Sequence, residues 1–186
     1  LKVMIDDFEI YTNLPCDILI NPNIVSELDL SEPCIRLLGP SYAPIREEIR
    51  QFAGLWQSHT RQDQFYECLI SLGATDPLNV TSSVLKKLAQ CPQSQSFRFT
   101  VLLSSSAPNL NAVLTLCSIL KPDLLIEVLV DIEEMGSIYQ RAHCCIGAAG
   151  SSAWERSCVG LPTAQIVVAD NQQHIQNEML ISSAIV

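Results

Sequence analysis

The sequence predicts an α/β protein built on a Rossmann-like, doubly wound parallel sheet, and three observations support this prediction. From Tyr66 onward, short runs of Val, Ile and Leu alternate with helical segments. The runs are apolar at successive positions, which is typical of strands buried on both faces of a parallel sheet. Helix start and stop signals separate the runs, and right-handed crossovers then place helices on both sides of the sheet.

The expected elements follow in five successive units. Strands are predicted at 66–72, 97–103, 124–130, 143–146 and 163–168. Helices are predicted at 77–90, 109–120, 132–142, 152–159 and 171–182. Asp76 suits the N-cap of the first helix and Pro77 its first turn, and Gly160 closes the fourth. Ligands of such sheets bind beyond the carboxyl ends of the strands.

Residues 1–60 have a different pattern, interrupted by prolines. Strands are predicted at 3–5 and 18–20 and a helix at 42–52, with a polar linker at 57–64. The chain begins within a strand-like segment and without Met. We therefore interpret 1–60 as the remnant of an N-terminal domain and 61–186 as a ligand-binding Rossmann-like domain, together forming a piece of a longer protein.

Composition excludes several classes of function. The formal net charge of −9 argues against a nucleic-acid partner held by a broad basic surface. No apolar run reaches the roughly 18 residues of a membrane span, and no signal peptide is present, so we expect a cytoplasmic protein. The eight cysteines form no C-x-x-C pair and predict buried, reduced thiols. Carboxylates are not clustered, so neither a metal nor a cofactor is expected.

The turn from Gly147 into the helix at 152–159 is the sharpest candidate for chemistry. Its small residues allow a ligand to approach the backbone, and the first amides of a helix are unpaired and lie at its positive end. We expect Gly150, Ser151 and Ser152 to bind a phosphate or pyrophosphate, and Glu155 to accept hydrogen bonds from a ribose diol. The alternative is structural, because Ser152 and Glu155 also match a capping box.

Two further loops follow strands and are expected to face the same crevice. The first loop carries Gly73, Ala74, Thr75 and Asp76, and the second carries Asp170, Asn171 and Gln172. Backbone amides of the first loop would contact the ligand, and polar side chains of the second would contact a sugar. For each loop the alternative is a helix cap, supplied by Asp76 in the first and by Asp170 or Asn171 in the second.

These motifs together resemble the nucleotide-sugar hydrolase family of the pseudaminic acid pathway. The resemblance rests on Gly-Ala-Thr-Asp-Pro at 73–77, Gly-Ala-Ala-Gly-Ser-Ser-Ala-Trp-Glu-Arg at 147–156, Gly-Leu-Pro at 160–162 and Asp-Asn-Gln at 170–172. Segments at 5–7, 16–19 and 38–46 also resemble the family. The resemblance implies a two-domain GT-B fold and removal of UDP from UDP-2,4-diacetamido-2,4,6-trideoxy-β-L-altropyranose.

The resemblance also implies roles for individual residues. The turn at 150–152 would hold the pyrophosphate, Glu155 the ribose, the loop at 73–76 the inner face of the site, and Asn171 and Gln172 the sugar. The chain departs from the family at Ala74 and Asp170, where glycine and glutamate are usual. The family's glycine-rich turn with its catalytic histidine has no counterpart in this sequence and is expected to precede Leu1.

The sequence therefore predicts the donor half of a UDP-sugar hydrolase that cleaves the anomeric C–O bond. As a fragment without its base, the chain itself is expected to turn over little substrate. Its expected partners are the UDP-sugar and the missing N-terminal segment of the same chain. Two alternatives stay open: a GT-B glycosyltransferase that uses a UDP-sugar donor, and a donor-binding subunit without chemistry.

Overall fold

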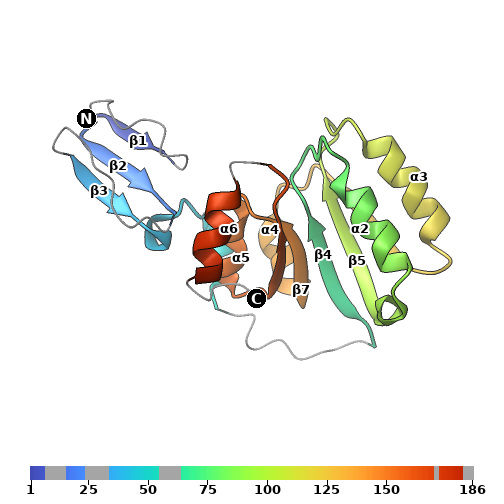
Figure 1. Cartoon of the computed structure of the whole chain (residues 1–186). Coiled ribbons are helices and arrows are strands. Elements are labelled where there is room, and N and C mark those ends of the chain that lie inside the picture. The colour runs from blue at the N-terminus through green and yellow to red at the C-terminus, as the bar shows by residue number, and fades with distance from the viewer. Residues whose placement is uncertain (7–15, 24–33, 55–63, 170–171, 182–186) are drawn as a thin grey trace.

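The computed structural model describes residues 1–6, 16–23, 34–54, 64–169 and 172–181. A small three-stranded sheet lies at one end of the molecule, and a larger α/β unit carries the rest of the described chain (Figure 1). The small sheet is parallel, in the order β1-β2-β3, with β1 at Val3–Ile5, β2 at Ile18–Asn21 and β3 at Ile35–Leu38. A short 3-10 helix, η1 (Pro40–Tyr42), follows β3.

The larger unit is a five-stranded parallel sheet in the order β6-β5-β4-β7-β8. The strands are β4 (Tyr66–Ser71), β5 (Phe97–Leu103), β6 (Leu125–Val130), β7 (Cys144–Ala148) and β8 (Thr163–Ile166). The helices are α1 (Glu47–Arg50), α2 (Val80–Ala89), α3 (Leu110–Leu120), α4 (Met135–Arg141), α5 (Ser152–Val159) and α6 (Gln172–Ile181), with a 3-10 helix η3 (Pro92–Ser96) before β5. The predicted doubly wound parallel sheet is confirmed.

Alternation along the strands divides the apolar side chains between two helical layers. Ile70 of β4 packs with side chains of α2 and α3 on one face, where Leu85 and Val113 are also buried. Leu69, its neighbour in the strand, packs on the opposite face with side chains of α1, α4 and α5. Because both faces are covered, the central strands are apolar at successive positions, as the sequence predicts.

Helix α1 belongs to this core although it precedes the predicted linker. Ile49 is fully buried against Tyr139 of α4 and Val159 of α5. The backbone amide of Gly54 also donates to the carbonyl of Cys158. The segment at 55–63, which holds most of the predicted linker, lies outside the described residues. The domain boundary near residue 60 therefore stays a prediction.

Several predicted boundaries are wrong for identifiable reasons. The helix predicted at 42–52 is instead η1 and a short α1, separated by the extended segment around Pro44, because a residue before proline avoids the α conformation. Helix α2 begins at Val80 rather than at the predicted Pro77, since Asp76 and Asn79 have positive φ angles. Strand β3 was not predicted.

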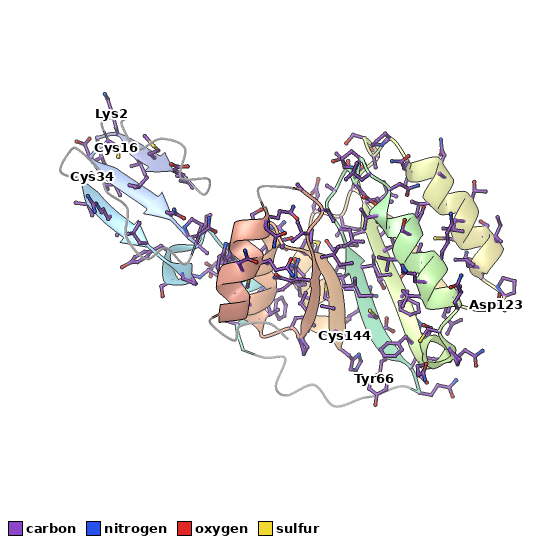
Figure 2. The ribbon with its side chains drawn as sticks, in the orientation of Figure 1. Lys2, Cys16, Cys34, Tyr66, Asp123 and Cys144 are labelled. Atoms are coloured by element: carbon purple, nitrogen blue, oxygen red, sulfur yellow. The ribbon has the colours of Figure 1, made fainter. Side chains whose placement is uncertain are left out.

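The structure also tests the predictions that the thiols are buried and reduced and that no segment spans a membrane. All eight cysteines are free thiols, but Cys91 is exposed and four others are half-buried, so burial holds for three of them. The thiols of Cys16 and Cys34 are neighbours just before β2 and β3 (Figure 2). Cys144 of β7 pairs in register with Cys68 of β4. Within the described ranges, no helix has the length and apolar character needed to cross a bilayer.

Candidate functional site

A cavity of about 380 Å³ opens at the carboxyl ends of β4, β5 and β6. Gly73 and Ala74 line it after β4, and Asp131 lines it after β6. Ser152 and Glu155 reach it from the first turn of α5. This is the edge at which parallel α/β sheets bind ligands, so the structure brings four predicted site residues to one expected place.

The turn between β7 and α5 presents its backbone to this edge. Gly147 must lack a side chain, because a Cβ there would lie 2.6 Å from Cζ of Arg156. In the described part of the chain, the amides of Ser151 and Ser152 donate to no partner. They stand at the positive end of α5, where a phosphate group is favoured.

Glu155 is held by two donors from distant parts of the chain. Its Oε1 accepts from Nε of Arg46 at 3.2 Å, and its Oε2 accepts from the hydroxyl of Tyr139 at 3.0 Å. Its side chain is 15% exposed. Each carboxylate oxygen can accept a second hydrogen bond, so Glu155 retains the capacity to bind ligand hydroxyls.

The capping-box alternative is wrong. Helix α5 has no side-chain cap, and Glu155 is directed to Arg46 and Tyr139. Ser152 Oγ accepts instead from Nη1 of Arg156 at 3.1 Å. Ser152 and Glu155 therefore contact other side chains and do not cap the helix.

Arg46 is the main residue that sequence reasoning did not assign to the site. Its Nη1 donates to the carbonyl of Glu133 at 3.0 Å and pairs with Oε1 of Glu48 at 3.0 Å. The carboxylate of Glu48 also accepts from the amide of Met135. Arg46 therefore ties the segment before α1 to α4 and α5. Its partner Glu155 is 109 residues away, and no local pattern signals that contact.

Tyr139 completes the support of Glu155. Burial raises the pKa of its phenol well above the usual value, and the negative charge of Glu155 raises this pKa further. The hydroxyl therefore stays protonated at neutral pH and acts as a donor. The sequence predicted a helix at this position but assigned no role to Tyr139.

The loop after β4 divides into two parts. Gly73, at a φ of +98° that favours glycine, and Ala74 line the cavity. Asp76 is buried, and its carboxylate accepts from the amides of Val80 at 2.9 Å and Thr81 at 2.8 Å. The capping alternative therefore holds for Asp76, while Thr75 is exposed and does not line the cavity.

The last predicted loop is described only in part. Asp170 and Asn171 lie outside the described residues. Gln172 Oε1 accepts from the amide of Val168 at 3.0 Å, and its Nε2 would lie 3.4 Å from a Cβ at position 150. The Gln172 side chain therefore lies beside the Gly150 turn. That the two loops share one ligand stays a prediction.

A second cavity, of about 300 Å³, adjoins the first. Ser152 and Glu155 line both cavities. The opposite wall of the second cavity comes from the small sheet and the segment after it, through Ile5, Asn23 and Ala43. The two cavities therefore lie on either side of the first turn of α5 and share Ser152 and Glu155 as lining residues.

The far end of the first cavity carries an acceptor. Asp131 Oδ1 accepts from the amide of Ser105 at 2.9 Å, and this contact bridges the loops after β5 and β6. Hydrogen bonds from the side chain and backbone of Ser105 hold the pKa of Asp131 below its usual value. The carboxylate is therefore ionised at neutral pH. Among the described residues, no three potential ligands gather into a metal site.

Comparison with known proteins identifies the fold. No family model matches the chain. An uncharacterized protein, MJ1062, from Methanocaldococcus jannaschii is 24% identical over 173 residues, which cover 90% of this chain and 34% of that protein. The crystal structure of MurG from Acinetobacter baumannii superposes with a TM-score of 0.53 at 17% identity and covers 89% of this chain. The match spans 44% of the MurG chain, and it shows that this protein has a GT-B-like fold.

Proposed function

We propose that the chain binds a UDP-sugar and forms the donor half of an enzyme that cleaves the anomeric C–O bond to release UDP. The observation that carries the proposal is that Ser151, Ser152 and Glu155 line one cavity at the start of α5, where, among the described residues, the amides of both serines donate to no partner. Such amides favour a diphosphate, and a carboxylate favours a vicinal diol. A nucleoside diphosphate carries both groups.

The proposed pose follows from these two anchors. The diphosphate lies against Ser151 and Ser152, and the ribose hydroxyls donate to Glu155. The Gly73–Ala74 backbone forms the inner wall beside the nucleotide. The sugar extends toward Gln172, whose side chain lies beside Gly150.

The chemistry requires a polar leaving-group site and a base. The turn amides and the positive end of α5 would stabilise the departing UDP. A general base would activate water at the anomeric carbon. Among the described residues we assign no base, because the carboxylates of Glu155 and Asp131 are already engaged by neighbouring donors. The resemblance to the hydrolase family suggests a histidine supplied by another segment of a longer protein.

Transfer of the sugar to an acceptor is the second candidate, and the structural similarity to MurG favours it. The donor half would bind UDP-sugar in the same way in both reactions. Product analysis of the longer protein separates the two candidates. Release of free sugar without an added acceptor supports hydrolysis, and a requirement for an acceptor supports transfer.

Calorimetric titration with UDP tests the binding proposal. Glu155→Ala is expected to raise the Kd for UDP about 10-fold or more, because it removes hydrogen bonds to a charged acceptor. Glu127→Ala is the matched control, since Glu127 lies exposed on β6 and away from the cavity. An unchanged Kd in Glu155→Ala would remove Glu155 from the site. Absence of UDP binding by the unaltered chain would overturn the proposed function.

A further inference from the structure

A buried cation lies directly behind the proposed phosphate turn. Arg156 is 1% exposed, and its guanidinium fills the space beside Gly147. Its Nη2 donates to the carbonyl of Ala148 at 2.6 Å and its Nη1 to Ser152 Oγ at 3.1 Å. The buried Nε has no hydrogen-bond partner among the described residues. The guanidinium is thus anchored to both ends of the turn between β7 and α5.

No anion offsets this charge within the described ranges. Every ion pair found there involves another cation, and the neighbouring Glu155 is directed to Arg46. An arginine side chain does not lose its proton in proteins. A buried charge without an opposite charge is unfavourable, so the site is more favourable when an anion lies close to the guanidinium.

Ser152 connects the buried cation to the cavities. Because its Oγ accepts from Arg156, its own proton is available to an acceptor elsewhere. Ser152 lines both cavities, so a ligand oxygen in either can accept that proton. Arg156 therefore engages the Ser152 oxygen as an acceptor, which leaves the Ser152 proton to be donated into a cavity that Ser152 lines.

We propose that Arg156 is a positioning residue that makes the site selective for the diphosphate of its ligand, through its buried charge and through the orientation of Ser152. The proposal rests on the proposed function. It assigns the preference for a phosphate-bearing ligand to Arg156, which lines neither the first nor the second cavity. A nucleoside diphosphate should gain from Arg156, and the corresponding nucleoside should gain little.

The test compares UDP with uridine, which lacks phosphate. Kd values for both ligands are measured by NMR titration in the unaltered chain, Arg156→Met, Arg156→Lys and Ser152→Ala. In Arg156→Met the preference for UDP over uridine is expected to fall about 10-fold to 100-fold, with uridine binding nearly unchanged. Arg156→Lys should restore part of the preference, because the charge remains but the paired geometry is lost. Ser152→Ala should also reduce it.

Arg141→Met is the matched control, since it makes the same change at an exposed arginine on α4. An equal loss of UDP and uridine binding in Arg156→Met, in a folded protein, would indicate a structural role and overturn the proposal. If Arg156→Met does not fold, Arg156→Lys and Ser152→Ala decide, and an unaltered UDP preference in both also overturns it. Failure of the unaltered chain to bind UDP would instead overturn the proposed function itself.

Discussion

The two sheets of this protein share strand direction and composition but differ in how their side chains are covered. Both are parallel and rich in Val, Ile and Leu. In the five-stranded sheet Ile70 is completely buried, whereas Ile35 of the three-stranded sheet is 62% exposed. Among the described residues, the three apolar clusters include no side chain from β1, β2 or β3. Strand sequence alone therefore does not establish burial, which depends on the helices packed on each face.

The difference extends to the candidate site. The turn at 147–152 joins two packed elements, since β7 before it and α5 after it both contribute side chains to the core. The small sheet contributes one wall of the second cavity through Ile5 and Asn23. We infer that the large unit positions the proposed nucleotide-binding residues and that the small sheet contributes less to stability.

The largest expected effect separates the two sheets by stability. Ile70→Ala should lower the free energy of unfolding by about 2–5 kcal/mol, because it opens a cavity in a closed core. The same change at the exposed Ile35 should cost at most about 0.5 kcal/mol. Urea denaturation followed by circular dichroism measures both values. Equal losses at the two positions would contradict the comparison.

The glycines that follow the strands should respond for different reasons. Gly147→Ala should lower the free energy of unfolding by about 1–3 kcal/mol and weaken UDP binding, because the new Cβ displaces the Arg156 guanidinium. Gly39, after β3, has open space around it but a φ of +96°. Gly39→Ala should therefore cost about 1 kcal/mol through backbone strain alone, and Gly39→Asn less. Thermal denaturation with and without UDP tests both, and UDP affinity retained in Gly147→Ala would argue against the interlocked turn.

Replacing an aspartate in each part of the molecule, Asp76 or Asp17, should give a smaller difference in the free energy of unfolding. Asp76→Ala should lower the free energy of unfolding by about 0.5–2 kcal/mol, since two amides at the start of α2 lose their acceptor. Asp17 in the small sheet accepts from the amide of Lys2, but its side chain is exposed. Asp17→Ala should change stability by less than about 0.5 kcal/mol. Urea denaturation of the two variants decides whether the buried cap matters more.

Replacing Tyr139 is expected to change the free energy of unfolding least at neutral pH, and its effect should appear at alkaline pH. Because the folded state raises its pKa, the neutral phenol contributes stability that is complete below the usual tyrosine pKa of about 10 and is lost as pH rises above it. Tyr139→Phe should therefore reduce the alkaline loss of stability. Tyr42→Phe, at an exposed tyrosine beside the small sheet, is the control. Identical denaturation profiles of the three proteins between pH 9 and about 11 would contradict this prediction.

The sequence predicted most of the larger unit because its signals are local. Strand β5 and helix α5 have the predicted bounds, and Gly160 closes α5 with a φ of +79°. Buried strands bracketed by polar turns and capped helices leave few alternatives. The sequence did not predict that α2 begins as late as Val80. The Asp76 carboxylate accepts from amides four and five residues further along the chain, which is a longer reach than the predicted cap had.

The sequence predicted which loops form the candidate site, but it did not predict the contacts between their side chains. Gly73, Ala74, Ser152 and Glu155 were predicted from small residues that follow strands and from the start of a helix, and the structure brings all four to one cavity. The contacts of Glu155 with Arg46 and of Arg156 with the turn arise from folding of distant segments or from burial. Sequence spacing carries no information on which of several polar groups a buried guanidinium meets.

The interlock between Gly147 and Arg156 has an evolutionary consequence. A long side chain from α5 occupies the place where residue 147 would otherwise carry its own Cβ. In related proteins the two positions should consequently change as a pair, with a side chain at the strand position accompanied by a shorter residue on the helix. Replacements at positions 147 and 156 would then distinguish relatives that keep a charged residue at position 156 from relatives that fill the same space with an uncharged side chain.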